Sequence, residues 1–405
     1  MSTLALAFFT LSAAADPVDD ALLGKVGSGT MTESVAALTD LLAANPDDDR
    51  TRLALGMLKI IKTGESTSQW FYRYGVGNPT KNVSMFVFPM LASVPSNPEP
   101  EQLSIKDIDI FMKSWMADLA EAEMVLTKIK DGNIRLDVDI AKLRLDLNGD
   151  GVASDREMTG RAFFDVLWRG PADEDPTFII GADRADAEWL IAYCHIFMAF
   201  GELYLAHDFS DMFERTGHVF FPNTDTPFDF IKGRNVFDPM GAGVDIADII
   251  AAFHLMRFEV DEPERMEAAR QHFLRAIGHS RIMWVHAMGE TDNHREWLPN
   301  PEQDGVMQGM AITADRIKLW HDLLADTEAA LNGTKLLRFW RGDGSKGINL
   351  RKFFEEPQTF DLILWIQGTA ARDYLEEGEL TRDFLWRDFE RAFGNEPFRY
   401  IFYVN

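Results

Sequence analysis

The sequence is poor in cysteine, in positive charge and in long apolar runs. Its one cysteine, Cys194, excludes a disulfide framework, which a chain of 405 residues does not need in order to bury a core. Lysine and arginine number 40 against 65 aspartates and glutamates, a formal charge of −25 that argues against nucleic acid as a partner. No segment has the roughly twenty consecutive apolar residues of a membrane-spanning helix, so we expect no membrane insertion.

A short apolar run opens the chain. Residues 4–11 are almost wholly apolar, and the alanines at 13–15 precede Asp16, which is the arrangement of a secretory cleavage site. No lysine or arginine stands before the run. Residues 1–15 are therefore predicted to be a signal peptide, with a buried N-terminal helix as the alternative. A periplasmic or secreted bacterial protein follows, because a eukaryotic extracellular protein more often carries disulfides.

One stretch has the ligand spacing of a calcium loop. Oxygen side chains occupy positions 1, 3, 5, 9 and 12 of residues 146–157, and a glycine occupies position 6. Calcium takes six to eight oxygen ligands, so the chain must wrap tightly, and the glycine permits the sharp turn. The predicted ligands are Asp146, Asn148, Asp150, the carbonyl of Val152, Ser154 and Glu157. The stretch resembles an EF-hand loop over these residues only, and this resemblance implies that the protein binds calcium.

The flanks of this loop differ from those of a paired EF-hand. Ser154 and Glu157 have the spacing of a capping box, which predicts a helix after the loop. Before the loop, apolar and polar residues alternate over 134–141, which predicts an extended segment. A second loop of this pattern is absent, so we expect a structural calcium that fixes a strand to a helix and no opening switch. The alternative is a polar turn that binds no ion.

Helical periodicity dominates the rest of the chain. It predicts helices over 32–44 with Thr32 as the cap, 52–61, 105–130, 183–207, 244–256, 264–288 and 313–331. Residues 66–100 are expected to be irregular, with aromatic rings that either pack onto the body or line a cleft. The predicted fold is mainly α, with packed helical hairpins and a short extended segment leading into the EF-hand-like calcium loop.

The sequence also suggests how the chain is divided. Besides the signal peptide, we expect an N-terminal helical region at 16–130, a calcium-binding segment at 131–170 and a C-terminal helical region at 171–405, or one compact unit over 16–405. The helix pair joined by Asn45-Pro46-Asp47 resembles a single tetratricopeptide-type unit. Such units stack in threes or more, so an ordinary hairpin is the alternative. The remainder is similar to secreted bacterial proteins, and this likeness implies no activity.

A few residues are candidates for chemistry. His286, Glu290 and His294 are spaced four apart, as zinc ligands on one helix would be, but Gly289 interrupts such a helix. The polar turn 290–297 is the first place to look for an acid–base site. His195 and Cys194 lie in an apolar helix and are expected to be a hydrogen-bonded core histidine and an inert buried thiol.

Two classes of function remain open from the sequence. The first is an exported calcium-binding protein with a structural calcium site, which acts without catalysis by binding or interacting with unidentified protein partners. The second is a secreted or periplasmic hydrolase with its site near the 290–297 turn. The sequence does not assign catalytic residues.

Overall fold

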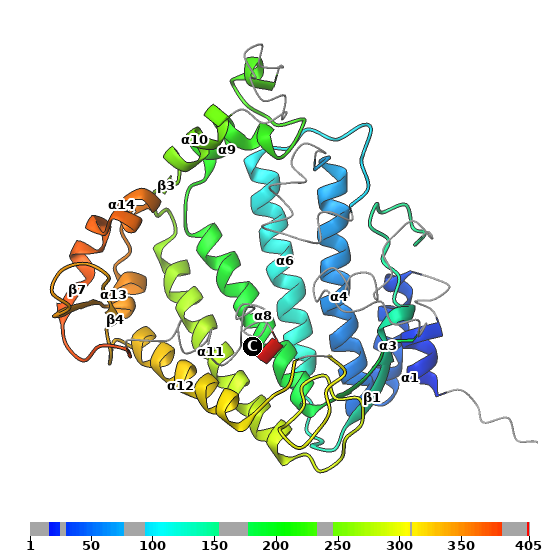
Figure 1. Ribbon diagram of the computed structural model, residues 1–405. Helices are drawn as coiled ribbons and strands as arrows, with labels where there is room; N and C mark the ends of the chain where they lie inside the picture. The colour runs from blue at the N-terminus through cyan, green and yellow to red at the C-terminus, as the bar shows by residue number, and fades with distance from the viewer. Residues whose placement is uncertain are drawn as a thin grey trace, which may run out of the picture.

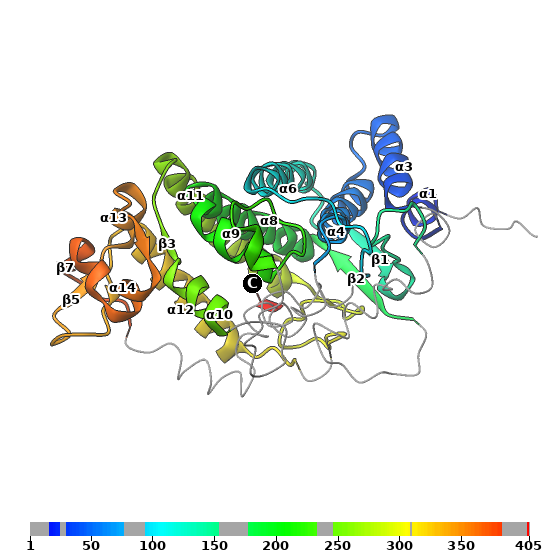
Figure 2. The same cartoon turned by 90° about the horizontal axis from the view of Figure 1, so that it is seen from above.

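A row of long helices forms the body of the protein. The computed structural model describes residues 16–24, 30–76, 94–153, 177–232, 246–307, 310–382 and 403–404. Most of these residues are helical, which confirms the predicted mainly α class. Four helices lie side by side in the row: α4 (Asp49–Arg73), α6 (Ile105–Leu126), α8 (Arg184–Leu205) and α11 (Pro263–Gly289) (Figures 1 and 2).

A second layer lies along one side of this row (Figure 2). It contains the strands β1 (Arg135–Asp139) and β2 (Ile179–Asp183), the loop 290–307 and helix α12 (Ala314–Leu331). The two strands pair antiparallel, with Leu136 opposite Ala182 and Val138 opposite Ile180. These four side chains are buried, and exposed residues alternate with them in β1. The extended segment predicted before the calcium loop is thus confirmed as a strand.

Shorter elements lie at the two ends of the row (Figure 1). Beside α4 are α1 (Pro17–Asp19), η1 (Asp20–Gly24) and α3 (Met31–Ala44). Beyond α11 are β3 (Arg257–Phe258), β4 (Leu337–Arg338), β5 (Lys346–Ile348), α13 (Leu350–Glu355), β6 (Phe360–Asp361), α14 (Leu362–Gln367), η7 (Thr369–Tyr374) and β7 (Leu375–Glu377). The connections hold η4 (Ile140–Lys142), α9 (Ser210–Thr216), η5 (Gly217–Val219), η6 (Asp229–Lys232) and α10 (Ile246–His254).

The largest apolar cluster joins segments that are far apart in the sequence. It includes Val18 near the start of the described chain, Leu136 on β1, Trp284 on α11 and Val404 near the end. Trp284 and Leu136 are at most 1% exposed. The regions expected at 16–130, 131–170 and 171–405 therefore all contribute to this core.

Two helix starts illustrate where local sequence signals succeeded and failed. Helix α8 begins as predicted at Asp183, whose carboxylate accepts hydrogen bonds from the N–H groups of Ala185 and Asp186. The start of α3 was predicted incorrectly, because its cap is Thr30 and not Thr32. Thr30 forms a reciprocal capping box with Glu33, in which the side chain of each residue accepts the backbone N–H of the other.

Helix α4 is longer than its sequence pattern predicts. It continues to Arg73, so the irregular segment expected from residue 66 begins at least eight residues late. The hydroxyls of Thr63, Thr67 and Ser68 donate to carbonyl oxygens four residues earlier, so these polar residues satisfy themselves inside the helix. Trp70 then stacks on Phe111 of α6 with ring centroids 4.6 Å apart, so these aromatics pack onto the body.

Some predictions fall on residues that the structure does not describe. These are the signal peptide at 1–15, the ligands Ser154 and Glu157, and the helix expected after the calcium loop. Among the described helices, none combines the length and apolar character that crossing a bilayer requires.

Candidate functional site

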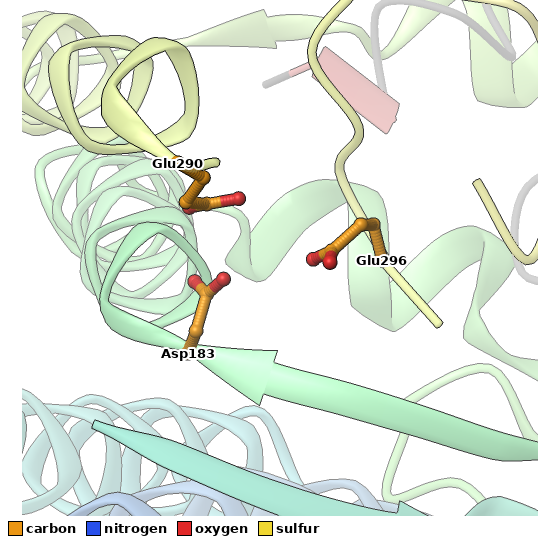
Figure 3. A group of neighbouring side chains, drawn as sticks. All are labelled: Asp183, Glu290 and Glu296. Atoms are coloured by element: carbon orange, nitrogen blue, oxygen red, sulfur yellow. The ribbon is translucent and has the colours of Figure 1, made fainter. Parts of the chain in front are cut away.

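Three carboxyl groups converge where the second layer meets the helix row (Figure 3). Asp183 stands at the end of β2, Glu290 directly follows α11, and Glu296 lies in the turn after it. One oxygen from each of the three lies within 4.8 Å of the others. We call these three residues the carboxyl cluster.

A close backbone contact brings Glu296 to the cluster. The N–H of Gly181 on β2 donates to the carbonyl of Arg295 at 3.0 Å. A Cβ atom at position 181 would lie 2.3 Å from the carbonyl oxygen of His294, so only glycine permits this approach. Arg295 itself has a φ of +59°, which turns the chain so that the next residue points inward. Glu296 is consequently only 2% exposed.

Burial and mutual repulsion hold protons on the cluster. Burial, together with the charge of Asp183, raises the pKa of Glu290 to about 8. Burial also raises the pKa of Asp183 and of Glu296. A hydrogen bond links the carboxyl groups of Asp183 and Glu290, which requires that one of them be protonated. Glu290 is the member that keeps a proton near neutral pH.

The surroundings of the cluster supply few compensating charges. Arg135 lies 3.9 Å from Glu296 and makes its shorter ion pair with Asp292. Glu296 accepts the backbone N–H of His294 at 2.6 Å, and Glu290 accepts the side-chain amide of Gln303 at 3.2 Å. Asp186 is 6% exposed beneath Asp183, and burial raises its pKa well above the usual range. Such oxygen-rich surroundings can share protons or hold a divalent cation.

The spacing of His286, Glu290 and His294 does not produce a shared site. Helix α11 ends at Gly289, so the three residues do not continue along one helix face. Only Glu290 joins the cluster, while the ring of His294 contacts Asp137 at 3.1 Å. The sequence indicated the 290–297 turn as a candidate site but did not indicate Asp183. Asp183 was predicted only as a helix cap, and nothing in its local sequence shows that it lies beside Glu290 and Glu296.

The structure describes residues 146–153 of the predicted calcium loop, and these fold around Asp146. Its two carboxylate oxygens accept the N–H groups of Gly149 at 2.7 Å and Gly151 at 2.9 Å. Asn148 accepts the N–H of Asp150 at 2.8 Å in the same manner. Gly149 and Gly151 have φ values of +76° and +86°, the left-handed region that favours glycine. Gly151 is thus the sharp turn that a calcium loop needs at its sixth position.

This loop is attached to helix α4. The N–H of Asp146 donates to the carboxylate of Glu65 at 2.9 Å, and the side chain of Gln69 donates to the carbonyl of Asp146 at 2.8 Å. Asp146 is 7% exposed, whereas Val152 at the seventh position is 63% exposed. Asp146 is therefore fixed to α4, whereas Val152 faces solvent.

Two other predictions for single residues are confirmed. Cys194 is buried, and burial raises the pKa of its thiol to about 12, so it is unreactive at neutral pH. His195 is 3% exposed, and its Nδ1 lies 3.0 Å from Nδ1 of His272. Burial lowers the pKa of His195 to about 3, which keeps the ring neutral. Neither residue belongs to the carboxyl cluster.

No protein-family model, no curated protein and no solved structure matches the chain.

Proposed function

We propose that the protein binds calcium through residues 146–157 and that this ion has a structural role. The observation that carries the proposal is the backbone path of residues 146–153. Gly151 takes the left-handed turn at the sixth position, and Asp146 points its carboxylate into the concave side of the loop. Asp146, Asn148, Asp150, Val152, Ser154 and Glu157 would be the ligands.

The attachment to α4 gives such an ion a structural consequence. Asp146 is hydrogen bonded to Glu65 and Gln69, and the strand β1 lies a few residues before it. Calcium would neutralise the loop carboxylates and so hold the segment that follows β1 against the helix. At a calcium concentration ten times the dissociation constant, mass action would add about 1.4 kcal/mol to the free energy of unfolding.

Export is part of this proposal and rests on the apolar run and the alanines at 13–15 alone. Extracellular calcium loops work at roughly 10⁻⁴–10⁻³ M, so a periplasmic or secreted location would keep the site occupied. In that setting the protein would act by binding or interaction rather than by catalysis.

Calorimetric titration of calcium into the full-length protein tests the calcium proposal. Glu157→Gln should abolish loop binding, because the twelfth position supplies a bidentate carboxylate. Asp155→Asn removes the same charge at the tenth position, which is not a ligand, and should keep the affinity within about threefold. Equal calcium affinities for the two variants would show that calcium responds only to the net charge of the segment and would contradict binding by the loop ligands.

The carboxyl cluster favours a second candidate, a hydrolase centred on the 290–297 turn. Three carboxyl oxygens within 4.8 Å could hold a divalent cation, and such an ion would supply Lewis-acid activation of water. Without the ion, Glu290 keeps a proton near pH 7 and could act as a general acid.

Proton release separates this second candidate from the calcium loop. Magnesium or manganese binding at the cluster should expel the proton from Glu290, and a pH-indicator titration at pH 7 would detect it. Glu290→Gln should eliminate the released proton while leaving calcium binding by the loop intact. The candidate fails if neither ion releases a proton from the parent protein.

A further inference from the structure

An apolar pocket lies between the helix row and the segments that carry β1 and β2. Its volume is about 420 Å³, which is within the range of small-molecule sites. Helices α4, α6 and α8 form one side. Ile180 and Ala182 of β2, together with Leu143 and Leu145 before the calcium loop, form the other.

The positions of the lining residues show that the cavity is elongated. On α4 they run from Met57 to Thr67 at helical spacing, a length of about 15 Å at 1.5 Å per residue. On α8 they run from Asp186 to Phe197, a length of about 16 Å. Spread over this length, the volume leaves a cross-section that suits one extended alkyl chain.

The chemistry of the lining excludes most other occupants. Apart from Asp186, Gly64 and two threonines, the lining is aliphatic or aromatic. The hydroxyls of Thr63 and Thr67 donate within α4. Water needs two to four polar partners to stay in such a space. The pocket is partly open to solvent, so its apolar walls face water unless an occupant covers them. A hydrocarbon occupant removes that apolar surface from water.

The residues at one end of the cavity also restrict the charge that the head group of such a molecule can carry. Asp186 and Trp297 belong to the lining, and they adjoin Asp183 and Glu296 of the carboxyl cluster. The described lining residues include no lysine, arginine or histidine that could pair with an anion. A carboxylate or phosphate head would therefore find no cation among these residues to offset the cost of burying its charge.

We propose that this cavity binds a neutral molecule with a single linear alkyl chain of about ten to twelve carbons, of the fatty-alcohol class. The proposal is independent of calcium binding by the loop and of metal binding by the carboxyl cluster. Trp115, Trp189 and Trp297 line the cavity, so their fluorescence reports on its occupant.

Titration of the full-length protein with 1-decanol at pH 8 tests the inference, followed by tryptophan fluorescence and calorimetry. We expect saturable binding of one molecule, and at least tenfold weaker binding of decanoate, which has the same chain and a negative charge. Absence of saturable decanol binding, or equal binding of decanoate, would overturn the proposal.

A filled cavity provides the matched comparison. Ala182→Leu places added carbon atoms in the cavity and should weaken decanol binding at least tenfold, while the melting temperature stays equal or rises. Ala141→Leu makes the same change beside β1 outside the lining and should bind decanol like the parent. If Ala182→Leu lowers the melting temperature, Gly64→Ala is the milder filling variant. Unchanged decanol affinity in a folded filling variant would place the alcohol elsewhere and contradict the assignment.

Discussion

The calcium loop and the carboxyl cluster both gather acidic side chains, and they do so by opposite means. In the loop, backbone N–H groups of Gly149 and Gly151 point at the carboxylate of Asp146 and satisfy it. In the cluster, the contact between the 290–297 turn and β2 brings Glu296 close to Asp183 and Glu290, and protonation relieves the repulsion between the carboxyl groups. The loop thus supplies backbone donors to its carboxylate, whereas burial in the cluster raises the pKa of Glu290 and Glu296.

This difference separates the roles that the two regions can have. If the loop binds calcium as we propose, its backbone is already turned for an ion, which suits a permanent structural site. An ion at the cluster would have to displace the proton of Glu290, so its binding would depend on pH. The two regions also depend on glycine differently. Gly181 lets the turn that carries Glu296 approach β2 closely, whereas Gly151 adopts the left-handed backbone conformation in the loop.

The largest effect is expected from Gly181→Ala. The new Cβ would lie 2.3 Å from the carbonyl oxygen of His294, so the turn carrying Glu296 must move away. We expect a loss of about 3 kcal/mol in the free energy of unfolding, measured with urea. Gly132→Ala, where a Cβ meets nothing within 4 Å, is the control and should change stability far less. Equal losses in both variants would mean that the close approach does not constrain the cluster.

The next largest effect should come from Glu65→Ala. This change leaves the buried N–H of Asp146 without its acceptor, which costs about 2 kcal/mol. Calcium affinity should fall as well, because the first ligand loses its fixed base. Glu65→Gln keeps an acceptor oxygen and should recover most of the stability in the same urea experiment. A fully stable Glu65→Ala protein would show that the loop is not held by α4.

Removing the charge of Glu290 should produce a pH-dependent gain. Its pKa is raised to about 8 from 4.5, so the folded state binds the proton more tightly than the unfolded state. Stability from this group is present below pH 4.5 and is lost as pH rises toward 8. Glu290→Gln avoids that loss, and we expect a gain on the order of 1 to 2 kcal/mol at pH 9 after allowing for partial exposure.

The internal control for this prediction is the measurement at pH 4, where Glu290 is protonated in both states. Parent and variant should then unfold at similar urea concentrations. If Glu290→Gln raises the free energy of unfolding equally at both pH values, the gain comes from packing. Repulsion between the carboxyl groups would then not be the property that distinguishes the cluster.

The smallest stability effect in this set is expected from Gly151→Ala. Nothing lies within 4 Å of the new Cβ, so the cost comes only from a φ of +86° and is about 1 kcal/mol. Gly278→Ala, inside α11 and equally open, should instead gain up to about 1 kcal/mol from helix propensity. Calorimetry should also show weaker calcium binding by Gly151→Ala. A stable variant with parental affinity would mean that the turn tolerates other conformations.

The helices were predictable because their signals are local. Asp183 and Thr313 were readable as helix starts, and both cap the helices that follow them. The continuation of α4 through Thr63, Thr67 and Ser68 was missed, because hydroxyls that normally mark loops here bond back to the helix. Local sequence rules could not decide whether these hydroxyl residues end the helix or bond back to its carbonyl oxygens.

The candidate site was only partly predictable for a related reason. The predicted calcium loop is continuous in sequence, so the spacing of its proposed ligands needs no tertiary contact to be seen, and calcium binding stays a prediction. The carboxyl cluster requires β2, the end of α11 and the left-handed Arg295 to meet, and none of these contacts is local. The sequence therefore indicated the 290–297 turn but not the partnership of Glu290 and Glu296 with Asp183.

The measurement that tests the calcium account most directly is thermal unfolding of the full-length protein in excess EDTA and in millimolar calcium, together with Asp146→Ala and Glu157→Gln. We predict that calcium raises the melting temperature of the parent and leaves both variants unchanged. An unchanged parent, or a rise that persists in both variants, would contradict a structural calcium at residues 146–157.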